Sequence, residues 1–305
     1  MTNQEFEFIL FDRIEKIKSI NEQYNLEDNS YIAFSGGKDS RILHQLVDLA
    51  LPNNHIPRVF SNTGIEYQLM VKYVKNLALN DDRIIILAQT KNIRRTLEEY
   101  GYPFKSKEHS EKLSIYQSKV FKSKTVYKYL KVKDFGCPSI LKYQFNPNFK
   151  LKISKKCCLK LKKELSDRWA KDNNRKIKLT GIRKEEGGQR ATRGSCTIFK
   201  ENNLKSFNPL FVIDNEFEEE FIKRYNIRLC DLYYPPYNFK RTGCKGCPFN
   251  LNLQEDLIKL NQLLPNEYKQ CINLWKPVYD EYIRIGYRLK EYPHLILKSK
   301  KKKLF

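Results

Sequence analysis

The stretch Phe34-Ser35-Gly36-Gly37-Lys38-Asp39-Ser40, FSGGKDS, stands between a short apolar run and a segment with helical periodicity. The run at 31–34 predicts a buried strand, and the apolar residues of 41–50 fall on one face of a helix. Glycines in such a turn permit positive φ angles and close approach of a ligand, while the new helix offers its positive dipole end. The sequence therefore predicts a phosphate-binding loop, with a plain structural turn as the alternative.

The motif differs from the P-loop of GTPases and kinases. That pattern needs an earlier glycine, which the apolar run lacks, and a Ser or Thr after the lysine, where this chain has Asp39. Ser-Gly-Gly-Lys-Asp-Ser instead resembles the PP-loop of the ATP pyrophosphatases, also called adenine nucleotide alpha hydrolases. The resemblance implies that the loop holds the β- and γ-phosphates while chemistry occurs at the α-phosphorus.

The same resemblance gives each loop residue a role. Lys38 would neutralise charge on the phosphates, and Asp39 would orient Mg²⁺ or the loop itself. The other members would contact the phosphates through backbone N–H groups or hydroxyls: Ser35, Gly36, Gly37 and Ser40. The expected ligand is ATP, or else adenylyl sulfate or its 3'-phosphorylated form (PAPS).

The order of the predicted elements indicates the α/β class. Strands alternate with helices through the first half, as in a doubly wound parallel sheet of the adenine nucleotide alpha hydrolase kind. The expected strands are 31–34, 57–61, 83–88 and 177–181, with helices at 5–20, 41–50, 66–79 and 91–99. From about residue 190 the pattern becomes mostly helical, at 215–225, 253–263 and 266–287. We expect a PP-loop domain at 1–190 with a basic insertion at about 105–163, and a smaller helical region at 191–305.

The end of the second strand resembles the sulfonucleotide reductase branch of the PP-loop superfamily, the PAPS and adenylyl-sulfate reductases. The strand ends in Asn62-Thr63-Gly64-Ile65-Glu66, similar to that branch's Asp-Thr-Gly segment, with Asn62 in place of the usual Asp. The resemblance implies that the adenosine lies against this segment, at Asn62, Thr63, Gly64 and Glu66. A turn followed by a helix cap is the alternative.

A later segment resembles the same branch. Thr180-Gly181-Ile182-Arg183-Lys184-Glu185-Glu186, continuing to Arg190, is similar to its Thr-Gly-x-Arg-x-x-Glu…Arg segment. Planar guanidinium groups bind phosphate or sulfate oxygens through paired hydrogen bonds. We therefore expect Gly181 in the nucleotide site and Arg183 and Arg190 as anion clamps, with Arg183 joining Lys38 and Asp39 in catalysis. Surface salt bridges are the alternative role for the arginines.

Four of the eight cysteines form two close pairs. Cys157-Cys158 precedes a helical run, and Cys244-Lys245-Gly246-Cys247 is a Cys-x-x-Cys with a glycine inside, a short bite that lets two thiolates reach one cluster. This set looks like the ligands of the 4Fe-4S adenylyl-sulfate reductases and of the DNA phosphorothioation sulfurtransferases. The resemblance implies a 4Fe-4S cluster on Cys157, Cys158, Cys244 and Cys247. A structural zinc site and free thiols are the alternatives.

The other cysteines show no ligand spacing, and we expect them to be buried free thiols: Cys137, Cys196, Cys230 and Cys271. A reducing compartment such as the cytoplasm disfavours disulfides, so the eight cysteines are better interpreted as metal ligands or redox thiols. No apolar run is long enough for a membrane span, and the first residues lack the basic start of a secretory signal. The sequence therefore predicts a cytoplasmic protein without a membrane partner.

The formal net charge of +22 would attract polyanions. Residues 105–134 carry nine lysines against three acids, and 142–163 carry eight lysines and no acid. Interleaved aromatic residues suit backbone contact plus base stacking on DNA or tRNA: Tyr116, Phe121, Tyr127, Tyr129, Tyr143, Phe145 and Phe149. A solvated lysine-rich surface is the alternative.

Three functional interpretations stay open. In the favoured one, ATP adenylates an acceptor so that sulfur from a cysteine desulfurase, a thioredoxin-like protein or the cluster can displace AMP. In the second, the protein is a sulfonucleotide reductase, although those enzymes carry a C-terminal Glu-Cys-Gly nucleophile and no cysteine follows Cys271 here. In the third, it is a non-catalytic nucleic-acid-binding protein with a degenerate nucleotide site, which the intact Ser-Gly-Gly-Lys-Asp-Ser disfavours.

Overall fold

The computed structural model describes residues 1–118, 123–132, 136–187 and 194–295. The chain divides into two compact units, each built from three segments. The sheet unit contains Met1–Asn62, Gln68–Ala88 and Glu164–Pro235, and the helical unit contains Thr63–Tyr67, Gln89–Lys163 and Pro236–Phe305. The boundary expected near residue 190 stays a prediction from sequence.

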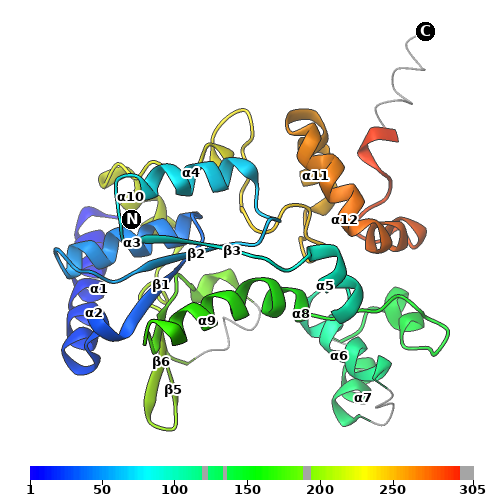
Figure 1. Ribbon diagram of the computed structural model, residues 1–305, viewed down its shortest axis with the longest axis horizontal. Coiled ribbons are helices and arrows are strands. Elements are labelled where there is room, and N and C mark those ends of the chain that lie inside the picture. Colours follow the sequence, from blue (N-terminus) through cyan, green and yellow to red (C-terminus); the bar gives the residue numbers. More distant parts are fainter. Residues whose placement is uncertain (119–122, 133–135, 188–193, 296–305) are drawn as a thin grey trace. The chain divides into compact units, whose positions relative to one another are not determined.

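The sheet unit contains a six-stranded sheet in the order β3-β2-β1-β4-β6-β5 (Figure 1). Its strands are β1 Ser30–Phe34, β2 Arg58–Asn62, β3 Ile84–Ala88, β4 Ile177–Leu179, β5 Thr197–Lys200 and β6 Asn203–Phe207. All neighbouring pairs are parallel except β5 with β6. The predicted α/β class with a mostly parallel sheet is confirmed.

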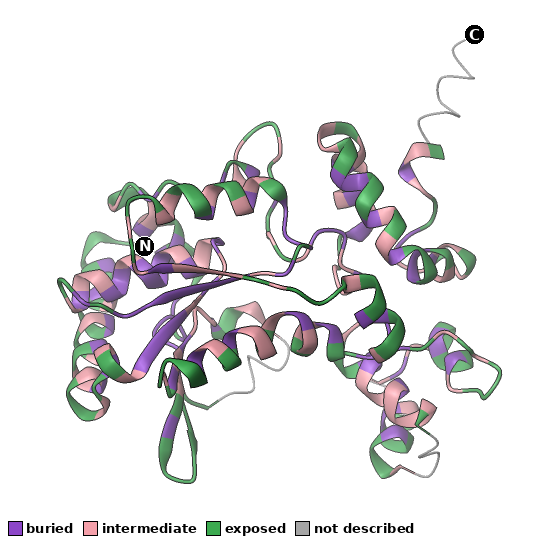
Figure 2. Ribbon diagram, viewed as in Figure 1, coloured by how far each residue is buried: buried purple, intermediate pink, exposed green. Residues whose placement is uncertain are grey.

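Helices cover both faces of this sheet, with α3 and α4 on one side and α9 on the other (Figure 1). The helices of the sheet unit are α1 Asn3–Tyr24, α2 Leu26–Asn29, α3 Lys38–Ala50, α4 Gln68–Ala78, α9 Glu164–Asp172 and α10 Asn215–Arg224, with 3-10 turns η3 Lys184–Glu186 and η5 Asp231–Tyr233. Because both faces are covered, the central strands bury consecutive side chains and not alternate ones (Figure 2). The apolar face predicted for α3 is fully buried, at Ile42, Leu43, Leu46 and Val47.

The hairpin of β5 and β6 differs from the sequence prediction, which is a mostly helical region beyond residue 190. Its turn residues Glu201 and Asn202 have φ angles of 51° and 59°. Two such residues in succession are typical of a two-residue hairpin turn. The hairpin matters for the fold because β6 pairs with β4 and extends the parallel sheet beyond the four predicted strands.

The helical unit contains no named strand among its described residues, and only an isolated bridge joins Tyr102 and Ile153. Its elements are α5 Ile93–Tyr100, α6 Lys107–Gln117, α7 Lys124–Lys131, η1 Ser139–Gln144, α8 Lys156–Cys158, η2 Leu159–Lys163, α11 Leu253–Leu263 and α12 Pro265–Arg284. The helices predicted at 253–263 and 266–287 are thus present. Of the helices in the described ranges, none has the length and apolar character needed to cross a membrane.

Several aromatic residues of the basic insertion pack inside the helical unit. Tyr129 is buried, and the ring of Phe145 contacts the rings of Tyr129, Tyr116 and His109. The imidazole of His109 also bonds to Tyr129 Oη at 3.0 Å and to Gln144 Oε1 at 2.7 Å. These rings form a local core, so the base-stacking role expected of them is reduced to exposed members such as Tyr127.

Gly36 combines a left-handed backbone with a crowded position. Its φ is 73°, and a Cβ there would lie 2.5 Å from Met70 Sδ and 2.7 Å from Val74 Cγ2. Gly187 has almost the same φ, 74°, but no atom of the described residues lies within 4 Å of its Cβ position. The two glycines therefore separate backbone strain from side-chain crowding.

We expect Gly36→Ala to lower the free energy of unfolding by about 1–3 kcal/mol more than Gly187→Ala. Both variants carry the strain of an alanine at positive φ, about 1–2 kcal/mol, whereas only Gly36→Ala overpacks the contact with α4. Urea denaturation of the two variants measures the difference. Equal destabilisation would show that α4 moves aside without cost.

Candidate functional site

The predicted PP-loop joins the end of β1 to the start of α3. Gly37 is the N-cap of α3 and, as a glycine, has no side chain to cap the helix. The Lys38 N–H donates to Tyr233 Oη at 3.3 Å, and the start of the helix keeps the positive dipole end that favours an anion. Hydroxyls stiffen the turn, because Gly37 N–H donates to Ser35 Oγ at 3.3 Å and Ser40 Oγ donates to the Gly37 carbonyl at 2.9 Å. Ser35 and Ser40 thus shape the loop through hydrogen bonds within it, and their contact with phosphate stays a prediction.

The loop lies at the switch point of the sheet. Strand β1 lies between β2 and β4 in the sheet. The chain continues from β1 to β2 on one side and returns later to form β4 on the other side. Segments that follow β1 and β4 therefore meet at the carboxyl edge, where nucleotides bind in open α/β sheets. Gly181 makes this meeting close, since a Cβ there would lie 2.9 Å from the carbonyl oxygen of Asp39.

Charged side chains converge at the start of α3. Lys38 Nζ lies 2.7 Å from Glu218 Oε1, and Arg183 Nε donates to Asp39 Oδ1 at 2.7 Å. Arg183 Nη2 also lies 2.8 Å from Glu218 Oε2, in an ion pair whose geometry does not meet the limits of a hydrogen bond. The structure thus brings together the three residues expected to act in catalysis, and adds the carboxylate of Glu218 from α10.

Glu218 was missed by the sequence analysis. Its side chain is 1% exposed, although an acid on an amphipathic helix normally faces water. Burial raises the pKa of Glu218, while the charges of Lys38 and Arg183 oppose the rise. Burial lowers the pKa of Arg183, but the charges of Glu218 and Asp39 raise it, and the net effect is a raised pKa. Glu218 is therefore the carboxylate that both cations share, while Arg183 also pairs with Asp39 and Glu185.

The other predicted nucleotide contacts divide between the two units. Asn62 ends β2 and belongs to the sheet unit, where β2 runs beside β1. Thr63, Gly64 and Glu66 belong to the helical unit, in which Glu66 Oε2 accepts from the Thr63 N–H at 2.8 Å and Lys162 Nζ lies 3.3 Å from Glu66 Oε1. Their contact with adenosine stays a prediction. Arg190 lies outside the described residues.

All four predicted cluster ligands belong to the helical unit. Cys157 Sγ donates to Cys158 Sγ at 3.9 Å, and this hydrogen bond lowers the pKa of Cys158 to about 6 while raising that of Cys157. The charges of Cys244 and Cys247 raise the pKa of Cys157 further. Burial raises the pKa of Cys244 to about 11. The two pairs are therefore close enough to interact electrostatically.

Side chains of helix α12 donate hydrogen bonds to backbone carbonyls of the Cys-x-x-Cys loop. Trp275 Nε1 donates to the Lys245 carbonyl at 3.1 Å, Tyr279 Oη donates to that of Gly246, and Tyr282 Oη donates to that of Pro248 at 2.9 Å. Gly246 allows this approach, since a Cβ there would lie 2.6 Å from Tyr279 Oη. The sequence analysis missed these positions, although their spacing of four and three residues places them on one helix face.

The donor set fits an iron–sulfur cluster in its chemistry. The four thiols belong to the helical unit, and the charges of Cys244 and Glu66 raise the pKa of Lys162 against the effect of burial. A nearby ammonium group suits the negative charge of a thiolate-bound cluster. Within the described residues, however, no group of three or more His, Cys, Asp or Glu side chains has the geometry to hold a metal ion. The cluster on these four cysteines therefore stays a prediction from the cysteine pattern.

The remaining cysteines differ in burial. Cys137, Cys230 and Cys271 are buried, as expected, and burial raises the pKa of Cys137 to about 11 and that of Cys271 to about 12. Cys196 is half-buried, in contrast to the expectation. It is the one cysteine outside the four predicted ligands with partial access to solvent.

A family model described as the phosphoadenosine phosphosulfate reductase domain matches residues 29–250. The match includes the PP-loop, the Asn-Thr-Gly segment, the arginine segment and both cysteine pairs. An uncharacterized protein of Methanocaldococcus jannaschii is 24% identical over 304 residues, which are 95% of this chain and 61% of that protein. The chain thus spans less than two thirds of the length of this relative.

Solved structures with similar folds include a PAPS reductase from Candida auris in a phosphate complex, at TM-score 0.43 and 12% identity over 80% of this chain and 96% of that one. The FMN adenylyltransferase of Candida glabrata, with FMN and an ATP analogue, has TM-score 0.45 and 14% identity over 80% of this chain and 67% of that one. The NH3-dependent NAD synthetase of Campylobacter jejuni has TM-score 0.40 and 14% identity over 91% of this chain and 94% of that one.

We expect Glu218→Gln to strengthen ATP binding about tenfold, the equivalent of about 1.4 kcal/mol. The substitution keeps the size of the side chain and removes the negative charge that competes with phosphate for Lys38 and Arg183. Isothermal titration calorimetry with ATP measures the change.

Glu220→Gln is the matched control, because Glu220 lies on the same helix and its ion pair with Arg224, at 2.6 Å, is near the surface. Its ATP affinity should stay within about twofold, as for most surface pairs. Weaker ATP binding in Glu218→Gln alone would mean that Glu218 supports the phosphate site and does not compete for it.

Proposed function

Because the chain belongs to the phosphoadenosine phosphosulfate reductase domain family, we propose that it is an enzyme that uses ATP to adenylate an acceptor for sulfur transfer. The observation that carries the proposal is the pairing of Lys38 and Arg183 with the buried carboxylate of Glu218 at the start of α3. Two cations and a helix N-terminus held around a replaceable anion suit the phosphates of a nucleotide.

In the proposed reaction an acceptor oxygen attacks the α-phosphorus of ATP. The bond from that phosphorus to the β-bridging oxygen breaks, and pyrophosphate leaves with the negative charge that Lys38 and Arg183 stabilise. Asp39, fixed by Arg183 Nε at 2.7 Å, orients Arg183 or a Mg²⁺ ion on the phosphates.

Sulfur then replaces the adenylated oxygen. The terminal sulfur of a persulfide, delivered by a sulfur-donor protein such as a cysteine desulfurase, attacks the acceptor atom, and the bond to oxygen breaks with AMP as the leaving group. A thiol of the thioredoxin type then attacks the cysteine sulfur of the donor protein and breaks the remaining S–S bond. The product keeps the terminal sulfur of the persulfide, and the donor's cysteine sulfur and the attacking thiol end as a disulfide. Cys157, Cys158, Cys244 and Cys247 would hold a 4Fe-4S cluster, which when bound supplies a site that can carry sulfur.

The acceptor proposed is DNA or tRNA, and the place is the cytoplasm. The net charge of +22 and the lysine-rich segments support a nucleic-acid partner, since they attract a polyanion over distance. Eight cysteines without a disulfide support a reducing compartment.

One observation favours a second function, the reduction of adenylyl sulfate or PAPS to sulfite. That reaction needs a thiol that attacks the sulfur of the nucleotide, and Cys196 is half-buried while Cys230 and Cys271 are fully buried. Cys196 belongs to the sheet unit, as does the PP-loop. It is therefore the candidate nucleophile for the alternative.

We expect ATP, a persulfide donor and tRNA or DNA to yield pyrophosphate and thiolated nucleic acid, with little sulfite from adenylyl sulfate or PAPS and thioredoxin. Anaerobic assays of pyrophosphate, thiolated product and sulfite measure the three. Lys38→Ala should lower pyrophosphate release at least tenfold, and Lys75→Ala, at an exposed lysine of α4, is the control. Strong sulfite formation that Cys196→Ser abolishes would instead establish the reductase.

We expect the protein purified anaerobically to be brown and to contain about four iron and four sulfide per chain. Cys244→Ser should lose most of the iron and most of the visible absorbance, because it removes one of the four predicted thiolate ligands. Cys137→Ser changes a buried cysteine of the same unit outside the set and should keep both. A single zinc and no iron after anaerobic reconstitution would contradict the cluster.

A further inference from the structure

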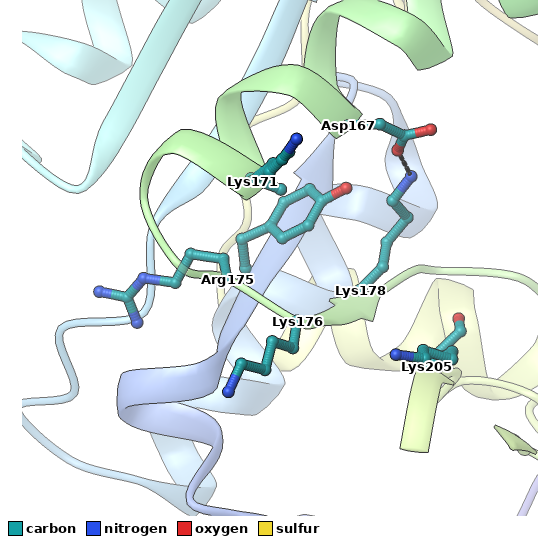
Figure 3. Close-up of a pocket in the computed structure, with 9 residues that line it drawn as sticks. Asp167, Lys171, Arg175, Lys176, Lys178 and Lys205 are labelled. Carbon is teal, nitrogen blue, oxygen red and sulfur yellow. Dashed lines mark hydrogen bonds and ion pairs between the residues drawn. The ribbon is translucent and has the colours of Figure 1, made fainter. Parts of the chain in front are cut away.

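A basic pocket lies on the sheet unit, apart from the PP-loop. It has a volume of about 400 Å³ and lies among β1, α9, β4 and β6 (Figure 3). Tyr31, Lys178 and Ser206 form one row across three parallel strands, because Tyr31 pairs with Lys178 and Lys178 pairs with Ser206 in the strand register. Side chains in one row point to the same face, so this row forms the floor of the pocket.

Positive charge dominates the lining. Five cations and one carboxylate line the pocket: Lys171, Arg175, Lys176, Lys178, Lys205 and Asp167. Asp167 already has a partner, since Lys178 Nζ donates to its Oδ1 at 2.6 Å (Figure 3). Arg175 donates to the backbone carbonyls of Glu27 and Ser30.

The other three cations have no counter-ion in the part of the chain that the structure describes. No ion pair joins Lys171, Lys176 or Lys205 to another described side chain. Several like charges around one concave surface repel one another unless an anion lies between them. The lining is therefore suited to a ligand with negative charge.

A buried donor lies at the floor of the same pocket. Tyr31 is 2% exposed, and its buried hydroxyl makes no hydrogen bond of ordinary geometry in the described residues, although Lys178 and Ser166 lie beside it. The Lys178 ammonium lies 5.6 Å from the centre of the Tyr31 ring. A buried hydroxyl without a partner costs free energy, and a ligand oxygen in the pocket would remove that cost.

The pocket and the PP-loop are separate along the same strand. Tyr31 is the second residue of β1, and the PP-loop begins at Ser35, after the strand has ended. At a rise of about 3.3 Å per residue, the four steps between them cover about 13 Å. A single phosphate chain at the start of α3 therefore does not fill the pocket.

We propose that this pocket is a second anion site that binds phosphate groups, through Lys171 and Lys176, which have no ion pair with a described side chain, and through the hydroxyl of Tyr31. The same phosphate chemistry occurs in a nucleic-acid backbone and in a small phosphorylated molecule, and the test distinguishes the two sources. The site does not depend on the proposed reaction, because it needs neither ATP nor the cysteines.

The test measures binding without ATP. Fluorescence anisotropy with a labelled single-stranded oligonucleotide, at two or more salt concentrations, reports the nucleic-acid source. Calorimetry with pyrophosphate, in protein that carries Lys38→Ala to remove phosphate binding at the PP-loop, reports the small-molecule source. The test variants are Lys171→Glu/Lys176→Glu, which reverses two charges, and Tyr31→Phe, which removes only the hydroxyl.

We expect the double variant to lose at least tenfold in affinity for one of the two probes, and Tyr31→Phe to lose about threefold for the same probe. If the probe is the oligonucleotide, the salt dependence should also fall by roughly two in log–log slope, as two phosphate contacts disappear. The matched control is Lys72→Glu/Lys75→Glu, the same change of charge at exposed lysines of α4 in the same unit.

The proposal is overturned if the double variant and the control weaken both probes equally, because the effect is then one of net charge alone. It is also overturned if neither variant changes the affinity for either probe. A loss confined to pyrophosphate supports the site and assigns it to a small phosphorylated molecule, whereas a loss confined to the oligonucleotide supports it and assigns a nucleic acid.

Discussion

The candidate nucleotide site depends on one electrostatic constraint: the positive charge at the start of α3 must have an anion beside it. The helix N-terminus, Lys38 and Arg183 all contribute to that charge, and Arg183 and Glu218 are largely removed from water. A buried charge without a partner would destabilise the fold by several kcal/mol. Glu218 meets the requirement together with Asp39, which Arg183 also binds, and the phosphate proposed here would meet it when a nucleotide binds. Stability and ligand binding are therefore linked through the same cations.

Close backbone approach is the second requirement, and glycines satisfy it at both candidate sites. Gly36 lets the PP-loop pack on α4, and Gly181 lets the segment after β4 contact Asp39. At the other site Gly246 lets the Cys-x-x-Cys loop lie under Tyr279, whose hydroxyl donates to the Gly246 carbonyl. In each case a Cβ at the glycine would lie 2.5–2.9 Å from a neighbouring atom, so the close approach needs glycine.

The lysines that make up the large positive charge of the chain differ in their partners. Lys38 is paired within the nucleotide site, and Lys162 lies near Cys244 and Glu66, whose charges raise its pKa. Lys171 and Lys176 line a pocket and have no ion pair with described residues. Net charge alone says that polyanions are attracted. Which lysines are available to an incoming anion follows only from their partners.

The sequence by itself determined the features that consist of neighbouring residues. The PP-loop, the four central strands, the helices from 5–20 to 266–287, the family and the two cysteine pairs were all predicted, because periodicity and motif spacing are local properties of the chain. Tertiary structure alone decided that Glu218 faces Lys38, that Trp275 and Tyr282 hold the Cys-x-x-Cys loop, and that β6 lies beside β4. An acid or aromatic residue on a helix looks the same in sequence whether it faces water or a site. Its role is set by the packing of elements that are distant in the chain.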